Sequence, residues 1–200
     1  MTNARIGRIL VASLHQAIGD LLPTRLEFYE NWLSAGGLKK GSMALAPMTA
    51  VLSFLRREGE GYDLVMARAG AYAGDWMADE MPAWERRLKL ALPGPFRARA
   101  ALRLGRTLVT RVYPPSRAVT RLRRRTATVD VHGSLFCDVR QAGRLPLCGF
   151  YAAAFAAIFE RFAVPARAQV DACRGTGAQG CSLSVVVGSS SLEQDAAEAA

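Results

Sequence analysis

The sequence predicts an α+β protein, because patterns typical of helices and patterns typical of antiparallel strands both occur along it. Residues 8–22 and 96–112 repeat apolar side chains at helical spacing. Residues 166–172 and 182–187 have the composition of two short strands, and the glycine-rich segment between them predicts a hairpin. The chain has 200 residues, 50% of them hydrophobic, which is enough to bury a core as one domain.

The N-terminal part predicts two helices. Residues 8–22 form one apolar stripe, and His15 falls on its polar side, where we expect a solvated side chain. Pro23 ends this helix, and residues 25–34 predict a second helix that stops before a pair of glycines. We expect residues 1–43 to cap the domain or to form a contact between two copies of the chain.

The following segment predicts a helix, a strand and another helix. Gly59 stands where the first helix should end, and residues 62–67 alternate in character like a strand. Residues 70–81 predict a helix that carries Tyr72 and Trp76 one turn apart on a common face. On spacing alone, such a pair is typical of an ordinary core.

A basic, acid-free block lies in the middle of the chain. Residues 86–129 contain 13 of the 26 lysines and arginines and no aspartate or glutamate, so most of the net charge of +9 arises there. Residues 96–112 predict an amphipathic basic helix, and residues 118–131 predict a long strand. The densest run consists of Arg121, Arg123, Arg124 and Arg125.

This basic block would attract an acidic protein partner, an anionic membrane surface or a ligand with carboxylates, and simple solvation of the charges is the alternative. Nucleic acid is not favoured as a partner, because neither helix-turn-helix spacing nor a pattern of stacking aromatics accompanies the charge.

Three cysteines surround a predicted helix and hairpin near the C-terminus. Cys148 is at the start of an apolar helix, and Cys173 and Cys181 lie at the two ends of the hairpin loop. Three sulfur atoms near one point provide most of a tetrahedral metal site, for which zinc is the expected ion. Asp171, which shares a strand face with Cys173 by the period of two, or Cys137 could be the fourth ligand. The alternative is that the cysteines are small buried side chains that bind nothing.

No catalytic motif stands out, so the sequence favours a binding protein over an enzyme. Residues 175–180 match G-x-G-x-x-G, but the strand pattern that follows lacks the helix that a dinucleotide site requires. The N-terminus has no signal-peptide pattern, and no apolar run is long enough to span a bilayer. We therefore expect a cytoplasmic protein whose cysteines are reduced or metal-bound.

The segment LCGFYAAAFAAIFERF, followed by VDACRGTGAQGCSLSV, resembles the C-terminal half of the 4-vinyl reductase domain family. This family is related in fold to the Golgi-transport Bet3 proteins and to the haem-based nitric oxide sensors. The resemblance extends over residues 44–187 and leaves 188–200 as a tail that we expect to be disordered. It implies an antiparallel sheet of four to five strands, packed with helices around an apolar pocket, in a homodimer.

The resemblance also implies site residues. Phenol-sensing members of the family hold zinc with three cysteines and a glutamate, and the cysteines correspond to Cys148, Cys173 and Cys181. The position of the glutamate is Val170 here, so Asp171 or Cys137 would have to replace it. In the family, the helix that corresponds to the one with Tyr72 and Trp76 walls the pocket. We hypothesise that Phe136, Phe150 and Phe155 line the same pocket, with arginines of the basic block at its mouth. His132 follows the predicted strand and could be a haem or metal ligand, a hydrogen-bond donor in the pocket or a turn residue.

The function implied by the resemblance is a sensor or carrier of an apolar small molecule, such as a tetrapyrrole-like or carboxylate-bearing compound. A second possibility is a dimeric interaction module of the same fold whose core is filled by its own side chains. A third is an accessory protein of vinyl-group reduction in bacteriochlorophyll synthesis, because one family member is linked to that pathway.

Overall fold

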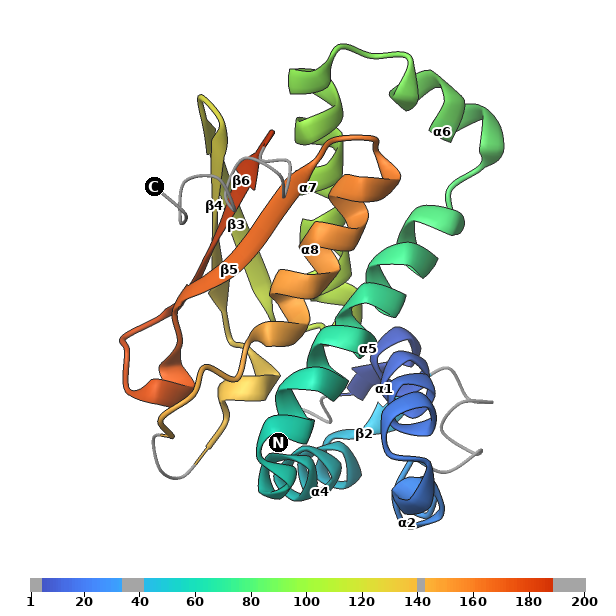
Figure 1. Cartoon of the computed structure of the whole chain (residues 1–200), viewed down its shortest axis with the longest axis vertical. Helices are drawn as coiled ribbons and strands as arrows, with labels where there is room; N and C mark the ends of the chain where they lie inside the picture. Colours follow the sequence, from blue (N-terminus) through green and yellow to red (C-terminus); the bar gives the residue numbers. More distant parts are fainter. Residues whose placement is uncertain (1–4, 34–41, 140–142, 189–200) are drawn as a thin grey trace, which may run out of the picture.

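The computed structural model describes residues 5–33, 42–139 and 143–188. Its centre is a four-stranded antiparallel sheet with the strand order β3-β4-β6-β5 (Figure 1). The strands are β3 (Arg117–Arg123), β4 (Thr126–His132), β5 (Ala166–Ala172) and β6 (Cys181–Val187). The predicted α+β class and antiparallel sheet are therefore confirmed.

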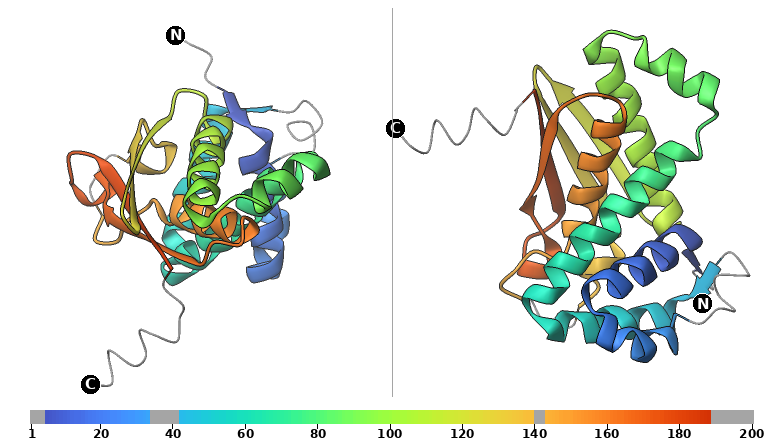
Figure 2. Two further views of the ribbon diagram at one scale, coloured as in Figure 1. Left: turned by 90° about the horizontal axis from the view of Figure 1, so that it is seen from above. Right: turned by 45° about the vertical axis from the view of Figure 1, so that its right-hand side comes forward.

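Helices cover one face of this sheet. Helix α8 (Gly149–Arg161) lies next to the strands, and α7 (Gly94–Val112) and α5 (Glu60–Asp79) pack against α8 (Figures 1 and 2). Along β4 and β6 every second residue is buried, because side chains of a strand alternate between the helix-covered face and the outer face. The core therefore lies between the sheet and α8.

The N-terminal part packs on α5 at one end of the molecule. It consists of β1 (Arg5–Gly7), α1 (Arg8–Leu21), the 3₁₀ turn η1 (Pro23–Arg25) and α2 (Leu26–Glu30). Strand β2 (Ser42–Ala44) pairs with β1, and α4 (Leu45–Leu55) and the 3₁₀ turn η2 (Arg56–Glu58) then lead into α5. Helix α6 (Ala83–Leu90) connects α5 to α7.

The contact between α5 and α8 is unusually close because α5 presents glycines to α8. A Cβ atom placed on Gly70 would lie 2.2 Å from the carbonyl oxygen of Phe150, and one on Gly74 would lie 2.6 Å from that of Ala154. No side chain fits at these positions, so the two backbones touch directly. This close packing holds α8 in a fixed position between α5 and the sheet.

Two predicted elements are wrong. Residues 62–67 are not a strand but part of α5, where Tyr62, Val65 and Met66 bury one helical face. A window of six residues is too short to distinguish a period of two from a period of 3.6.

The predicted long strand over 118–131 is instead the hairpin of β3 and β4, in which Arg123 pairs with Thr126 across a two-residue turn. The turn contains Arg124, with a φ of 52°, and Arg125 in place of the glycine or asparagine that usually signals such a turn.

Other predictions of helices and strands are confirmed. Helices α1 and α7 span the two amphipathic segments, and β5 and β6 form the predicted hairpin. The second N-terminal helix is shorter than predicted, and the glycine pair at 36 and 37 lies outside the described residues, as does the predicted disorder of 189–200. In the part of the chain that the structure describes, no helix is both long and apolar enough to cross a membrane.

Replacing Gly70 by alanine tests the contact between α5 and α8. We expect Gly70→Ala to lower the free energy of unfolding by about 1–3 kcal/mol, because the added methyl group forces the two backbones apart. Gly94→Ala is the matched control, since nothing lies within 4 Å of a Cβ atom at that helix start. Urea denaturation of both variants checks this expectation, and equal stability of the two would contradict it.

Candidate metal centre and neighbouring aromatic cluster

Four cysteines come together at one end of the sheet. Cys137 ends the 3₁₀ turn η3 (Leu135–Cys137), Cys148 is the N-cap residue of α8, and Cys181 begins β6. Cys173 follows β5 and precedes the 3₁₀ turn η4 (Arg174–Thr176). All four side chains are buried and none forms a disulfide. The structure thus places the three cysteines predicted from the hairpin and helix at one point, and Cys137 joins them.

The spacing of the four sulfur atoms fits one metal ion. The Sγ atom of Cys137 lies 3.1 Å from that of Cys148, 3.2 Å from that of Cys173 and 3.4 Å from that of Cys181. All four lie within 4.8 Å of one another. These separations exceed the ~2.05 Å of a disulfide bond. Four thiolates at ~2.3 Å from a central ion would be about 3.8 Å apart, so the cluster could hold a single tetrahedral ion.

The hairpin loop is shaped to reach the start of α8. Gly177, with a φ of 93°, turns the chain after η4 back towards Cys181. A Cβ atom on Gly175 would lie 2.7 Å from Cδ1 of Leu147, so only glycine lets the loop pack beside the residue that precedes Cys148. The carbonyl of Gly175 also accepts a 2.7 Å hydrogen bond from the amide of Gly143.

Backbone amides and the neighbouring thiols favour ionised sulfur at two positions. The amide of Leu147 donates to Sγ of Cys173 at 3.3 Å, and the amide of Arg174 donates to Sγ of Cys181 at 3.4 Å. Hydrogen bonds from the other thiols lower the pKa of Cys173, and those from Cys137 and Cys148 lower the pKa of Cys181 to about 7. The same bonds, together with burial, raise the pKa of Cys148. Full ionisation of the cluster therefore requires a cation.

Asp171 does not belong to the cluster. Its exposed carboxylate accepts hydrogen bonds from Ser184 Oγ at 2.9 Å and from Gln169 Nε2 at 3.3 Å on the outer face of the sheet. The register of β5 shifts between Val170 and Ala172, and the strand ends before Cys173. The alternation that would place Asp171 and Cys173 on one face therefore does not extend to the cysteine.

Two side chains from the helical side hold the loops that carry the cysteines. Arg56 Nη2 donates to the carbonyl of Phe136 at 2.9 Å, and the Tyr62 hydroxyl donates to the carbonyl of Leu147 at 3.0 Å. These carbonyls belong to the residues directly before Cys137 and Cys148. Burial raises the pKa of Tyr62, so its hydroxyl stays protonated and remains a donor.

Neither Arg56 nor Tyr62 is among the site residues that the sequence predicts, because their partners are backbone atoms about 80 residues away in the chain. The only sequence signal is the helical spacing of Tyr62 with Val65 and Met66.

Aromatic side chains pack beside the cysteines. The ring centroids of Phe136 and Phe150 are 5.1 Å apart, and Tyr151 lies 5.1 Å from Phe136 and 5.7 Å from Phe150. All three side chains have 0% exposure. We call these three residues the aromatic cluster. Phe155, further along α8, packs on Gly105 of α7, where a Cβ atom would lie 2.2 Å from the ring.

The hydroxyl of Tyr151 is buried and has no hydrogen-bond partner among the described residues. Its neighbour Ser116 donates its own hydroxyl to the carbonyl of Gly133 at 2.7 Å. Burial raises the pKa of Tyr151 and its interaction with the side chain of Ser116 offsets part of that rise, so this hydroxyl is neutral and keeps its proton. A buried polar group without a partner is costly, which makes Tyr151 the most unusual residue of the aromatic cluster.

The other residues predicted for a pocket lie elsewhere. Tyr72 and Trp76 stack at 5.6 Å on the side of α5 that faces α1, and the Tyr72 hydroxyl donates to Asp20 at 2.5 Å. That hydrogen bond lowers the pKa of Asp20. His132 is exposed at the end of β4. The structure therefore brings Phe136 and Phe150 together but places Tyr72, Trp76 and His132 at two other sites.

No family model matches this chain, and no curated protein matches it by sequence. Among solved structures, its fold is similar to the phenol-responsive sensory domain of the transcription activator PoxR, determined with phenol. The TM-score is 0.54 and the sequence identity 14%, over 80% of this chain and 88% of that one. The likeness shows that the two chains share a fold.

The hydrogen bond of Tyr62 can be tested by Tyr62→Phe. We expect a loss of about 1–3 kcal/mol in the free energy of unfolding, because the buried carbonyl of Leu147 is left without a partner. Tyr29→Phe is the matched control, since the hydroxyl of this equally buried tyrosine donates to Glu58, which is partly exposed and also pairs with Arg25. Chemical denaturation of both variants should show the larger loss for Tyr62→Phe, and the reverse order would contradict the assigned role.

Proposed function

We propose that this chain is a non-enzymatic small-molecule-binding domain of the sensory type, in which one zinc ion holds the end of the sheet to α8. The observation that carries the zinc proposal is the group of four buried sulfur atoms, from Cys137, Cys148, Cys173 and Cys181, within 4.8 Å of one another. Four thiolates are a typical ligand set for structural zinc. This set replaces the three cysteines and one carboxylate that the family resemblance implies.

The zinc would be structural rather than catalytic. Four protein ligands close the coordination shell, so no position remains for water or substrate. The ligands come from four separate segments that follow β4, precede α8, end β5 and begin β6. One ion would therefore fix the relative positions of the sheet, the hairpin loop and the start of α8.

The proposal of a small-molecule ligand is supported by the shared fold with a phenol-responsive sensory domain and by the unpartnered hydroxyl of Tyr151. A ligand with an apolar ring and one hydrogen-bonding group would pack among the rings of Phe136 and Phe150 and accept or donate a hydrogen bond at Tyr151. Because the rings are in contact, the ligand would have to separate them. A single ring suits this site better than a tetrapyrrole.

Ligand binding at the aromatic cluster would act directly on the metal centre. Phe136 is next to Cys137 in the chain, and Phe150 follows Cys148 by two positions. A ligand that moved either ring would therefore move a segment that carries a zinc ligand. We propose that this connection couples ligand binding to the positions of the segments that carry the cysteines.

An interaction module with a filled core is the second candidate. It is favoured by the complete burial and mutual contact of the aromatic cluster, which needs no ligand to be well packed. In this case the domain would act in the cytoplasm through a homodimer contact and through its basic surface, and no small molecule would bind between the rings.

Zinc binding is tested by native mass spectrometry of protein purified without chelator. We expect one zinc per chain, retained in Asp171→Asn and lost in Cys137→Ser, because only the cysteine belongs to the cluster. Protons compete with zinc for thiolates, so the metal should be lost on acidification, at a pH below the pKa of about 7 that Cys181 has without metal, because a bound cation keeps the thiolates ionised. Retention of zinc by Cys137→Ser would show that another group is the fourth ligand.

The ligand site is tested by calorimetric titration of Tyr151→Phe with phenol. Removal of an unpartnered buried hydroxyl should leave the stability unchanged or raise it by about 1 kcal/mol. The same change should weaken phenol binding about tenfold, which corresponds to one lost hydrogen bond.

Tyr72→Phe is the control and should bind phenol like the unaltered protein. If phenol and related single-ring compounds do not bind the unaltered protein, the filled-core module replaces the sensor as the proposed function.

A further inference from the structure

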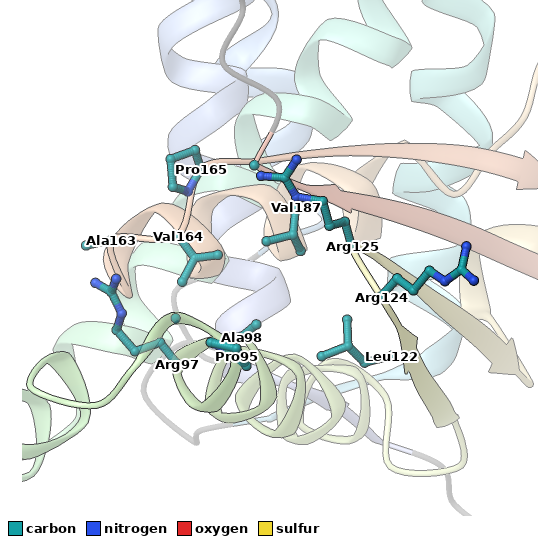
Figure 3. Close-up of a pocket in the computed structure, with 12 residues that line it drawn as sticks. Pro95, Arg97, Ala98, Leu122, Arg124, Arg125, Ala163, Val164, Pro165 and Val187 are labelled. Carbon is teal, nitrogen blue, oxygen red and sulfur yellow. The ribbon is translucent and has the colours of Figure 1, made fainter.

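A second candidate binding site lies at the opposite end of α8 and β6 from the cysteines. It is a pocket of about 290 Å³ between the start of α7, the β3–β4 turn, the connection from α8 to β5 and the end of β6. Figure 3 shows apolar side chains around this space, among them Ala98, Leu122, Val164 and Val187. The pocket therefore has an apolar floor.

Three arginines line the same pocket and no carboxylate does. Arg97 lies on one side and Arg124 and Arg125 on the other (Figure 3). Within the described ranges of the chain, none of the three forms an ion pair. Arg97 Nη1 donates a long hydrogen bond of 3.4 Å to the carbonyl of Phe162, and its Nε is buried without a partner. Among the described residues no carboxylate neutralises the positive charge at this pocket, and such a charge attracts anions.

The backbone around the pocket is strained. Arg124 and Ala163, with φ values of 52° and 51°, are the two non-glycine residues with positive φ in the described part of the chain, and both line the pocket. Ala163 occupies the position after α8 where glycine is usual, since the amide of Val164 bonds back to the carbonyl of Phe159. Strained residues tend to gather at functional sites, where the surrounding structure holds them in place.

Glycine at 188 shapes the rim of the pocket. Its φ is 85°, and a Cβ atom there would lie 3.0 Å from Nη2 of Arg125. The absence of a side chain thus lets the guanidinium of Arg125 lie across the end of β6. The amide of Val187 also donates to the carbonyl of Arg125 at 2.7 Å, which fixes the β3–β4 turn to this strand.

We infer that this pocket binds a small amphipathic anion. The carboxylate or phosphate head of the ligand pairs with Arg124 and Arg125, with Arg97 at the opposite wall, and a short acyl chain or single ring lies on the apolar floor. Guanidinium groups suit such heads because they form paired hydrogen bonds with them. The volume of about 290 Å³ lies just below the ~300–1,000 Å³ typical of ligand pockets, which restricts the apolar part of the ligand to a short one.

A neighbouring groove provides a comparison. It is lined by Arg103, Arg106, Thr107, Thr110, Arg117 and Ala118, and has a volume of about 440 Å³. It has as many arginines as the pocket, but apart from one alanine its lining residues are arginines and threonines, so it lacks the aliphatic side chains that form the floor of the pocket. Charge alone would attract anions to both places, whereas an apolar tail should select the pocket with the apolar floor.

The test is calorimetric titration of the zinc-loaded full chain with sodium octanoate, octyl phosphate, octanol and inorganic phosphate. We expect one of the two octyl anions to bind one per chain, and the stronger of them identifies the head group. Octanol and inorganic phosphate should bind at least about tenfold more weakly, since each lacks one half of the interaction. Equal binding of inorganic phosphate, or no binding of either octyl anion, would overturn the inference.

Variants locate the binding. The double change Arg124→Gln with Arg125→Gln should weaken octyl-anion binding about tenfold or more, since it removes two charge-assisted contacts. Val187→Trp should also prevent binding, by filling the floor without a change in charge. The control Arg103→Gln with Arg106→Gln removes the same charge from α7 outside the pocket and should bind normally.

Circular dichroism confirms that each variant is folded. Loss of binding in the control with retention in Arg124→Gln and Arg125→Gln would place the site in the neighbouring groove. The outcome is independent of phenol binding, because no residue of the aromatic cluster lines this pocket.

Discussion

The approach of four sulfur atoms to one point constrains the segments that meet at one end of the sheet, namely those after β4, before α8 and between β5 and β6. Cys181 begins β6 and faces Val131 of β4 in the register of the sheet, so the strand pairing determines where one sulfur lies. Cys148 ties the start of α8 to the same point. Since α8 in turn lies against the glycines of α5, the cysteine cluster, the sheet and the long helices form one continuous set of contacts.

The loops that carry Cys137 and Cys148 depend on hydrogen bonds from side chains on the helical side of the molecule. Segments 133–139 and 143–148 contain no long helix or strand, so hydrogen bonds outside regular structure must hold their backbones. Arg56 and Tyr62 supply two of these bonds, at the residue before each of two cysteines. In the aromatic cluster Phe136 of the first loop packs on Phe150 and Tyr151 of α8, so the same short segments contribute to the cysteine cluster and to the proposed ligand site.

The sequence predicts those parts of the fold whose signal is local. The C-terminal hairpin and α7 follow from composition and spacing within a dozen or so residues. The sequence alone could not show that the fourth residue of the cluster is Cys137 and not Asp171, because this depends on where β5 ends and on how η3 folds back onto the hairpin. The turn at Arg124 lacks a glycine, and the helical state of residues 62–67 is decided by their burial against distant segments. The pocket with Arg97 and Arg125 combines four segments that no local pattern connects.

Helix α8 connects the two ends of the molecule. Its 13 residues span about 20 Å, with Cys148 of the cysteine cluster directly before its start and Ala163 of the pocket shortly after its end. Its backbone touches that of α5, so the helix cannot bend into a gap and any displacement along its axis is shared by both ends. If occupancy of the cysteine cluster and occupancy of the pocket are coupled through this rigid helix, thermodynamic linkage requires each occupant to change the affinity for the other by the same factor.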